Sequence, residues 1–384
     1  MAYCTNIHAG NGWTEVFANL RRHAPELKRR LSPERPFALG LRLSAREAAE
    51  VRVDELSNFL RDHDLYVPLL NGFPHGNFHG SPVKEDVFRP DWRDPARLDY
   101  TLRLAGLLAR LLPPGMEGGV STLPLTYRPW VTPDDDLYRL LADRLREAAR
   151  GLERIEGETG RRVHLDVEPE PDGLLSTARD AADFFRSWLE PGPYLRVCLD
   201  ACHSAVEFES PELALEALQG IPIGRVQVSA ALKATFPGNR GTQAAVRGSA
   251  TRSPRPGSLS DQLEQLAEPV YLHQVVEDTG KRYPDLCRAQ PPHHPAEWRI
   301  HFHVPLFVEG FGELRSTRDE TRALLTAVRD RTAYLEIETY TWAVLPEALR
   351  SDLTGSIERE YRWVLEALAE PPSVCEGAPP SDRP

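Results

Sequence analysis

A short segment in the middle of the chain, LRVCLDACHSAVEFE (residues 195–209), combines residue types that bind divalent metal ions in proteins. Its first residues alternate as in a buried β-strand, and Asp200 ends that strand three positions before His203. One interpretation is structural, because an aspartate at a strand-to-helix junction caps free N–H groups of the helix. The other is chemical, because a carboxylate and an imidazole at one strand end can bind a metal ion. The choice depends on what the other strands place beside them.

Three further predicted strands carry polar residues near their ends. Alternation along VHLDVEPEP, RVQVSAA and YLEIETYT directs Glu168, Gln227 and Glu338 away from the apolar face of each strand. In a parallel barrel these side chains and Asp200 meet at one rim. Converging carboxylates repel one another unless a proton, a cationic side chain or a metal ion offsets their charge. We therefore predict a divalent metal site that includes His203, with a metal-free polar cluster as the alternative.

The elements that must position these residues are eight β-like runs separated by mostly helical segments. The runs lie at 2–8, 37–43, 65–73, 119–125, 163–170, 195–200, 225–231 and 334–341. This alternation predicts an α/β fold of the (β/α)8 TIM-barrel type. An open doubly wound sheet is the alternative, but no GxGxxG fingerprint follows the first run.

The connection between the seventh and eighth runs, residues 232–310, is too long for a simple loop. Its first part, 233–258, is rich in Gly, Pro, Ser and Arg and predicts a mobile loop. Two later β-like runs, 270–276 and 300–307, predict ordered strands. We expect this insertion to pack over the barrel mouth.

Histidines in the insertion and in the loop after the third strand are candidate substrate-binding residues. The alternation in IHFHVPLF places His301 and His303 on one face of a strand, and His273 lies on the preceding run. In LLNGFPHGNFHG, the glycines let the backbone carrying Asn71 and His75 approach a ligand closely. The alternatives are hydrogen-bonded structural histidines and an exposed surface loop.

The overall composition limits the partners and the location. Lys and Arg number 46 against 57 Asp and Glu, so the net charge of −11 disfavours nucleic acid as a partner. No apolar run approaches the ~20 residues that cross a bilayer, and the N-terminus lacks the features of a secretory signal. Five cysteines without regular spacing indicate reduced thiols. We expect a cytoplasmic protein with one barrel domain, residues 1–370, and a disordered tail, residues 371–384.

The order of the strand-end motifs resembles that of the xylose isomerase-like TIM-barrel superfamily, which includes sugar epimerases, inosose dehydratases and endonuclease IV. DACH is similar to the endonuclease branch, and LDVEPEP is similar to the epimerases. The resemblance implies that Glu168, Asp200 and Glu338 are metal ligands and that His203 belongs to the Asp-x-x-His motif. Gln227 stands where relatives usually carry a metal-binding histidine. An amide oxygen suits Mg²⁺ or Mn²⁺ better than Zn²⁺.

A closer resemblance is to the metabolite traffic protein EboE family. The segments that carry it include YCTNIHAG, LNGFPHGNFHG, HLDVEPEPD, DACHSAVEFE, HFHVPLF and ETYTW. Membership of that family implies a gene neighbourhood with a UbiA-like prenyltransferase and a TatD-like hydrolase. It also implies movement of a terpenoid precursor or other small metabolite towards the periplasm.

Three functions are consistent with these motifs. The first is a metal-dependent isomerase or epimerase acting on a small sugar-like or polyol metabolite, in which Glu168 and Glu338 exchange a proton at a substrate carbon. Its cofactor would be a divalent ion, Mn²⁺, Mg²⁺, Co²⁺ or Zn²⁺, that polarises a carbonyl and hydroxyl pair. The second is a non-catalytic metabolite carrier or scaffold. The third is a metal-dependent phosphodiesterase of the endonuclease IV type, which the acidic composition disfavours.

Overall fold

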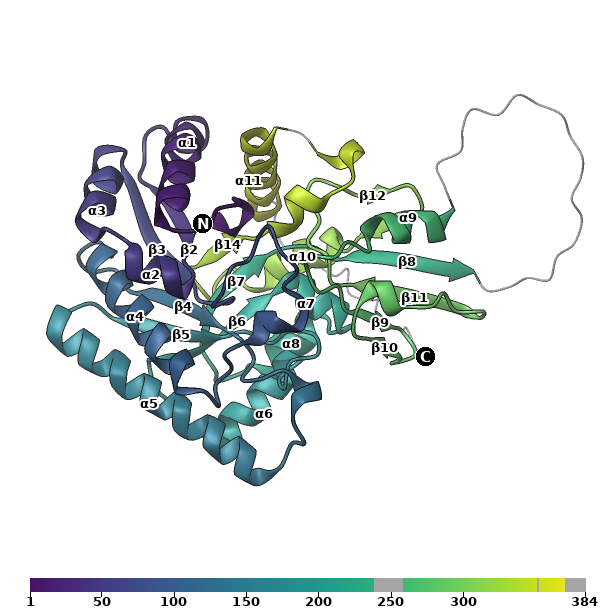
Figure 1. Cartoon of the computed structure of the whole chain (residues 1–384), viewed down its shortest axis with the longest axis horizontal. Coiled ribbons are helices and arrows are strands. Elements are labelled where there is room, and N and C mark those ends of the chain that lie inside the picture. Colours follow the sequence, from purple (N-terminus) through teal and green to yellow (C-terminus); the bar gives the residue numbers. More distant parts are fainter. Residues whose placement is uncertain (238–257, 351, 370–384) are drawn as a thin grey trace, which may run out of the picture.

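Eight parallel strands close into a barrel in the order β1-β14-β7-β6-β5-β4-β3-β2. The structure is a computed structural model that describes residues 1–237, 258–350 and 352–369. Helices α1 to α6 surround the barrel on its outer side (Figure 1). The predicted (β/α)8 fold is confirmed, and the open-sheet alternative is wrong.

Each barrel strand overlaps one of the eight runs predicted from the sequence. The strands are β1 Ala2–Cys4, β2 Phe37–Arg42, β3 Leu65–Asn71, β4 Gly118–Thr122, β5 Val163–Val167, β6 Leu195–Asp200, β7 Ile223–Val228 and β14 Leu335–Ile337. Apolar side chains that alternate along these strands, such as Val163, Leu165 and Val167, are fully buried in the main core. Period-two alternation therefore located the strands, because one face of each strand is buried in the core outside the barrel.

The helices that cover the barrel are amphipathic. They are α1 Trp13–Leu31, α2 Ala45–Glu50, α3 Val53–Asp62, α4 Pro95–Leu111, α5 Asp135–Thr159, α6 Ala178–Trp188, α7 Ala201–Val206, α8 Pro211–Ala217, α10 Arg318–Ala327 and α11 Leu353–Ala369. In α5, the side chain of Asp134 accepts a hydrogen bond from the Leu137 N–H, and Gly160 ends the helix with a left-handed φ of 67°.

One layer below the strand ends, the barrel interior holds a charged network. Arg225, fully buried on β7, donates to Asp166 over 2.9 Å and to Glu336 over 2.9 Å. Two glycines make room for these carboxylates. A Cβ at Gly224 would lie 1.8 Å from Asp166 Oδ1, and one at Gly40 would lie 1.7 Å from Glu336 Oε1. The network fills the space beneath the rim with paired charges.

After β7 the chain leaves the barrel and builds a second, six-stranded sheet in the order β10-β9-β11-β8-β13-β12. Its strands are β8 Leu232–Pro237, β9 Val275–Glu277, β10 Arg282–Tyr283, β11 Pro295–Ile300, β12 Gly310–Phe311 and β13 Leu314–Ser316. The sheet extends to one side of the barrel, with α9 (Leu259–Leu266) beside it (Figure 1). The chain then returns to the barrel through α10 and β14.

The predicted extents of the inserted strands are wrong. The segments 270–274 and 301–307 belong to no strand, because β11 pairs with β8 and β9 only as far as Ile300. Ile300 lies opposite Leu232 and Val275, which are the first residues of the two partner strands, so the chain beyond it has no neighbour to pair with.

Two segments predicted to be mobile are not covered by the structure. Most of the predicted loop (238–257) and the whole predicted tail (371–384) lie outside the described residues, whereas residues 233–237 belong to β8. Among the helices of the described part, none is both long and apolar enough to span a membrane.

Candidate metal centre

The carboxyl ends of the barrel strands and the insertion line one small pocket of about 50 Å³. Glu168 follows β5, Glu338 follows β14, and His301 and His303 follow the inserted strand β11. The residues expected from the sequence that line this pocket are Asn71, Glu168, His203, His301, His303 and Glu338.

Three carboxylates converge at this rim. One oxygen of each of Glu168, Asp200 and Glu338 lies within 4.8 Å of the oxygens of the other two, and all three residues are buried. Burial raises the pKa of Glu168 and Glu338 well above the usual range, and the charge of nearby carboxylates raises it further. Such a group is stabilised by a proton or by a cation placed between its members.

The contacts of Asp200 are consistent with both roles predicted for it, a helix cap and a metal ligand. Its Oδ1 accepts hydrogen bonds from the His203 backbone N–H over 2.9 Å and from the Ser229 hydroxyl over 2.8 Å, so it caps α7. Its Oδ2 is buried and has no hydrogen-bond partner within the described part of the chain. One oxygen therefore holds the local structure and the other is available to a ligand.

Glu338 is held in place by two amide side chains. Its Oε1 accepts hydrogen bonds from Asn6 over 2.6 Å and from Asn71 over 3.0 Å. The Oδ1 of Asn71 in turn accepts from the Phe73 backbone N–H over 3.0 Å. Asn71, which was expected to bind substrate, lines the pocket and also positions the Glu338 carboxylate.

His303 presents a free nitrogen lone pair to the same group. Its Nδ1 lies 2.9 Å from the main-chain carbonyl of Glu338, which can only accept, so Nδ1 carries the hydrogen. Its Nε2 is buried without a partner among the described residues, and one ring nitrogen of His303 lies within 4.8 Å of ligand atoms of Asp200 and His203. Burial lowers the pKa of His303 to about 4, which keeps the ring in the neutral form that binds metals.

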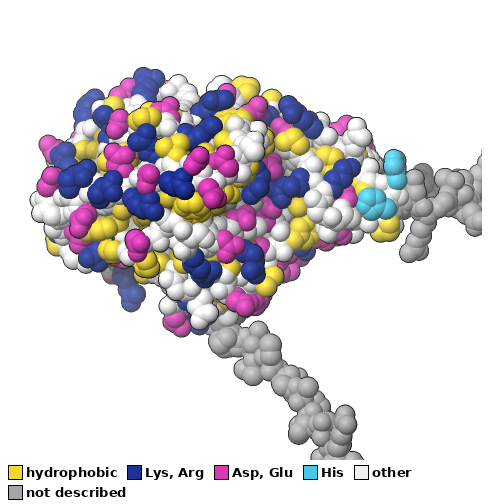
Figure 2. All heavy atoms as spheres, turned by 90° about the horizontal axis from the view of Figure 1, so that it is seen from below, with side chains coloured by type: hydrophobic (Ala, Val, Ile, Leu, Met, Phe, Trp, Pro, Cys, Tyr) yellow, Lys and Arg dark blue, Asp and Glu magenta, His cyan; other side chains and the backbone are white. Residues whose placement is uncertain are grey.

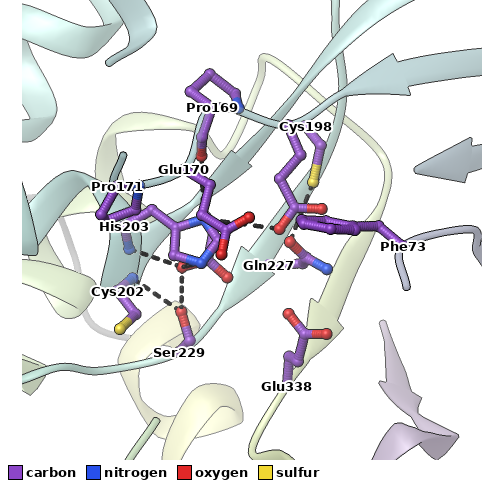
Figure 3. A network of polar contacts seen from close by, with 12 residues as sticks. Phe73, Pro169, Glu170, Pro171, Cys198, Cys202, His203, Gln227, Ser229 and Glu338 are labelled. Atoms are coloured by element: carbon purple, nitrogen blue, oxygen red, sulfur yellow. Dashed lines mark hydrogen bonds and ion pairs between the residues drawn. The ribbon is translucent and has the colours of Figure 1, made fainter. Parts of the chain in front are cut away.

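Gln227 is placed differently from the other predicted ligands. It lies on β7 directly opposite Asp200, but its Oε1 accepts a hydrogen bond from the Cys198 thiol over 3.2 Å, and the two side chains lie side by side in Figure 3. Its Nε2, which has no lone pair to offer a metal, is the atom left without a partner. Gln227 does not line the pocket itself, and neither does Asp200.

Two predicted substrate-binding histidines do not line the pocket either. His75 packs edge-on against Tyr100, with ring centroids 4.7 Å apart. His273 uses both ring nitrogens elsewhere, on Glu268 over 2.9 Å and on the His301 carbonyl over 2.8 Å. The expected alternation of the HFH segment holds although the segment is not a strand, because His301 and His303 reach the pocket while Phe302 stacks on His273.

Sequence reasoning missed several pocket residues. Glu170 is buried and lines the pocket, and the repeated Glu-Pro of EPEP is a signal that could have found it. Tyr340 covers His303, with ring centroids 4.6 Å apart, and Phe78 packs on Tyr340 at 5.0 Å. These aromatic rings form an apolar wall, and no sequence pattern distinguished them from core residues.

The carboxylates and histidines of the candidate metal centre lie at the C-terminal rim of the barrel. A sequence comparison identifies the family to which this barrel belongs. The family model described as xylose isomerase-like TIM barrel matches residues 33–251, more than half of the chain. This chain belongs to the xylose isomerase-like TIM barrel family. No curated protein matches it in sequence.

Solved structures similar to this chain share its fold at low identity. L-ribulose 3-epimerase is 15% identical with a TM-score of 0.51, covering 96% of this chain and 95% of its own. The IOLI protein with a bound zinc atom is 11% identical, with a TM-score of 0.52 and coverage of 96% and 97%. A xylose isomerase-like TIM barrel protein from Mycobacterium smegmatis, in complex with magnesium, is 12% identical, with a TM-score of 0.51 and coverage of 96% of each chain. At this identity the likeness concerns the fold.

Proposed function

We propose that this protein is a divalent-metal-dependent isomerase or epimerase that acts on a small sugar-like or polyol metabolite. The observation that carries the proposal is the group formed by Glu168, Asp200 and Glu338, whose oxygens lie within 4.8 Å of one another. No lysine or arginine in the described ranges forms an ion pair with any of the three; the basic group beside them is the His203 ring, 3.6 Å from Glu168 Oε1 and 4.0 Å from Asp200 Oδ1. A divalent cation is therefore the fitting counter-charge.

The ion would be held by these three carboxylates and by His303, since Asp200 Oδ2 and His303 Nε2 are both buried and unpartnered. We propose His303, rather than Gln227, as the nitrogen ligand, because the Gln227 oxygen is already bound to Cys198. Three oxygens and one imidazole suit Mn²⁺, Co²⁺ or Zn²⁺, with Mg²⁺ favoured only if water replaces the imidazole. When bound, the ion supplies Lewis-acid polarisation of a substrate carbonyl and hydroxyl pair.

Two carboxyl groups of the protein would transfer the proton of the substrate carbon. Glu168 and Glu338 reach the pocket from β5 and β14, which are separated by two strands around the barrel, so they approach a bound molecule from different sides. Their raised pKa values bring each carboxyl closer to the range in which it exchanges a proton efficiently. One carboxylate would take the proton from a substrate carbon and the other would return it. The aromatic wall of Phe78 and Tyr340 keeps water away from the reacting carbon.

The pocket favours a small molecule over nucleic acid. Its volume of about 50 Å³ is below the ~300–1,000 Å³ of typical small-molecule sites, so in this structure it admits only a small ligand. On the face drawn in Figure 2, basic and acidic side chains are intermixed rather than gathered into a basic stripe. Together with the net charge of −11, this weighs against the phosphodiesterase alternative.

The resemblance to the EboE family supports a finer proposal, in which the metabolite is a precursor handled together with a UbiA-like prenyltransferase. A carrier that binds this metabolite without transforming it is the second candidate. It is favoured by Gln227, which offers the pocket no ligand atom. The free thiols Cys4, Cys198 and Cys202 support the proposed cytoplasmic location.

The experiment that tests the proposal is deuterium exchange. Chelator-treated protein is reloaded with Mn²⁺ and incubated in D₂O with a panel of ketoses and polyols, and ¹H NMR follows loss of carbon-bound hydrogen. An isomerase exchanges hydrogen at the carbon next to the carbonyl, and Glu168→Gln and Glu338→Gln abolish the exchange. A carrier binds the sugar without exchange. Failure of the protein to bind any divalent metal would overturn the proposal.

A further inference from the structure

We propose that residues 76–83, in the loop after the third barrel strand, form a flap that opens to admit a ligand to the pocket. The pocket of about 50 Å³ is smaller than the ~300–1,000 Å³ of typical small-molecule sites, so part of its wall has to move before a molecule of sugar size can enter. The flap is a part of that wall that few contacts hold in place. The inference concerns entry to the pocket, and it stands whether or not the metal-dependent chemistry proposed above is correct.

Both ends of the flap are anchored by main-chain hydrogen bonds. Just before it, the carbonyl of His75 accepts a hydrogen bond from the Ala45 N–H over 2.9 Å. At its far end, the Val83 N–H donates to the Val270 carbonyl over 2.8 Å. Within the described part of the chain, no main-chain hydrogen bond involves residues 77–82. A segment without such bonds opens at low cost compared with the strands and helices around it.

One aromatic side chain closes the flap over the pocket. Phe78 is 6% exposed and lines the pocket, whereas the other residues of the flap are half-buried or exposed. Its ring centroid lies 5.0 Å from that of Tyr271 and 5.0 Å from that of Tyr340. These three rings form a hydrophobic cluster of their own, separate from the main core. Phe78 can therefore leave the cluster without disturbing the packing of the barrel.

A histidine side chain acts as the latch of the flap. Nε2 of His79 lies 2.6 Å from the main-chain carbonyl of Asn6, which only accepts, so Nε2 carries the hydrogen. Nδ1 of the neutral ring then accepts a hydrogen bond from the Tyr271 hydroxyl over 2.6 Å. Burial lowers the pKa of His79 to about 4, so the ring is neutral at neutral pH. One side chain thus joins the flap to the barrel through Asn6 and to the insertion through Tyr271.

Glycines on either side of the aromatic and latch residues provide the hinges. A Cβ at Gly76 or Gly80 would meet no atom within 4 Å, so packing does not restrain either position. Gly80 has a left-handed φ of 82°. Gly72, which precedes the flap, is clamped instead, because a Cβ there would lie 2.5 Å from the Ser121 carbonyl oxygen. The backbone is therefore restrained up to the flap and free to turn within it.

The flap also controls the access of water to the candidate metal centre. Phe78 packs on Tyr340, whose ring in turn covers His303, with centroids 4.6 Å apart. Opening would expose this side of the pocket as a ligand enters, and closing would shield it again. The alternative is a rigid wall, in which case the pocket takes only water or a bare ion.

Native-state proteolysis with chymotrypsin tests the flap, because this protease cleaves after aromatic residues and reaches Phe78 only when the flap is open. Full-length protein is digested without added metal or ligand, and mass spectrometry follows the initial rate of cleavage between Phe78 and His79. Tyr271→Phe removes the hydroxyl that bonds the latch but keeps the ring and the cleaved sequence. Loss of this hydrogen bond should speed the cleavage by roughly 2–10-fold.

Two other variants show whether the effect belongs to the flap. Tyr340→Leu loosens the packing of Phe78 without touching the latch, and it should also speed the cleavage. His75→Gln is the matched control, because His75 lies just outside the flap and packs on Tyr100, with ring centroids 4.7 Å apart. This variant should be cut after Phe78 at the wild-type rate.

Low concentrations of urea separate flap opening from unfolding of the barrel, and this arm uses wild type alone. Opening of a short segment exposes little surface, so cleavage after Phe78 should depend weakly on urea, whereas global unfolding depends on it strongly. Equal cleavage rates in wild type and Tyr271→Phe, or a urea dependence equal to that of global unfolding, would show a rigid wall and overturn the inference. Failure to bind a divalent metal would overturn the proposed function alone, so the two failures are distinguishable.

Discussion

His303, in the insertion, donates its Nδ1 hydrogen to the main-chain carbonyl of Glu338, at the end of the last barrel strand, over 2.9 Å. This bond joins two segments separated by β12, β13 and α10. It fixes the His303 ring, one nitrogen of which lies within 4.8 Å of an Asp200 oxygen, so the insertion supplies part of the candidate metal centre. The contact supports the proposal that barrel and insertion act as one domain.

Replacing His303 should weaken metal binding more than replacing Gln227. His303→Ala removes the only imidazole that we assign to the carboxylate site, and we expect Mn²⁺ affinity to fall by more than about tenfold. Gln227→Ala should change it by less than about twofold, since its oxygen is engaged by Cys198. Mn²⁺ titration followed by electron paramagnetic resonance measures both. The reverse order of effects would assign the ligand to Gln227.

Asp200→Asn should reduce metal occupancy while largely preserving the fold. The asparagine keeps an oxygen in place of Oδ1, which caps α7 and accepts from Ser229, but it replaces the free Oδ2 by an N–H₂ group that cannot bind metal. We expect a loss of stability below about 1 kcal/mol. Metal analysis and thermal unfolding are compared with Asp183→Asn, an exposed control. Unchanged metal content would remove Asp200 from the ligand set.

Metal affinity should rise with pH. The pKa values of Glu168 and Glu338 are raised in the metal-free protein, chiefly by burial, so protons compete with the metal for these oxygens. As the pH falls through the raised pKa values, both groups are protonated and affinity is lost. Calorimetric Mn²⁺ titrations at several pH values and in buffers of different ionisation enthalpy measure this proton release. Affinity that is independent of pH would contradict it.

Glu360→Gln should stabilise the protein at alkaline pH. Burial raises the pKa of Glu360 from 4.5 to about 7, despite hydrogen bonds from the Thr339 hydroxyl and the Leu306 N–H. Because the Glu360 pKa is higher in the folded state, the protonated carboxyl stabilises the fold, fully so below pH 4.5. This stabilisation is lost as the pH rises through about 7 and Glu360 ionises in the folded state. Relative to wild type, Glu360→Gln should gain up to about 3 kcal/mol by pH 8. Urea unfolding at pH 5 and pH 8 tests this, with exposed Glu366→Gln on the same helix as the control.

Arg225→Met should destabilise the barrel strongly. It leaves Asp166 and Glu336 buried without their cationic partner, which costs about 3–5 kcal/mol. Arg362→Met removes an exposed ion pair with Glu358 and should cost less than about 1 kcal/mol. Comparable urea midpoints for the two variants would mean that the interior network does not stabilise the fold.

The sequence predicted the barrel and its rim because both follow from local rules. Alternation along a strand decides which side chains point inward, and parallel strands end at a common rim. This placed Glu168, Asp200 and Glu338 together without any knowledge of strand order. The same rules placed Gln227 inward but could not show that the Cys198 thiol would engage its oxygen.

The remaining parts of the site depend on contacts between segments far apart in the chain. The insertion strands were misplaced because their ends are set by where β8 and β9 begin. The contacts of Asn71, His75 and His273 could not be foreseen for a similar reason, since each side chain bonds or packs against a partner that no local pattern reveals. Glu170 differs, because the EPEP repeat is visible in the sequence. Only the fold shows that Glu170 lies beside His203 and His301.

The central claim is that Glu168, Asp200 and Glu338 hold one divalent ion, and anomalous diffraction from crystals grown with Mn²⁺ tests it most directly. We expect one peak about 2.0–2.2 Å from an oxygen of each of the three carboxylates, with His303 Nε2 as a further ligand. A fully Mn²⁺-exposed crystal with no peak at these oxygens, or with a peak bound to other residues only, would contradict the account.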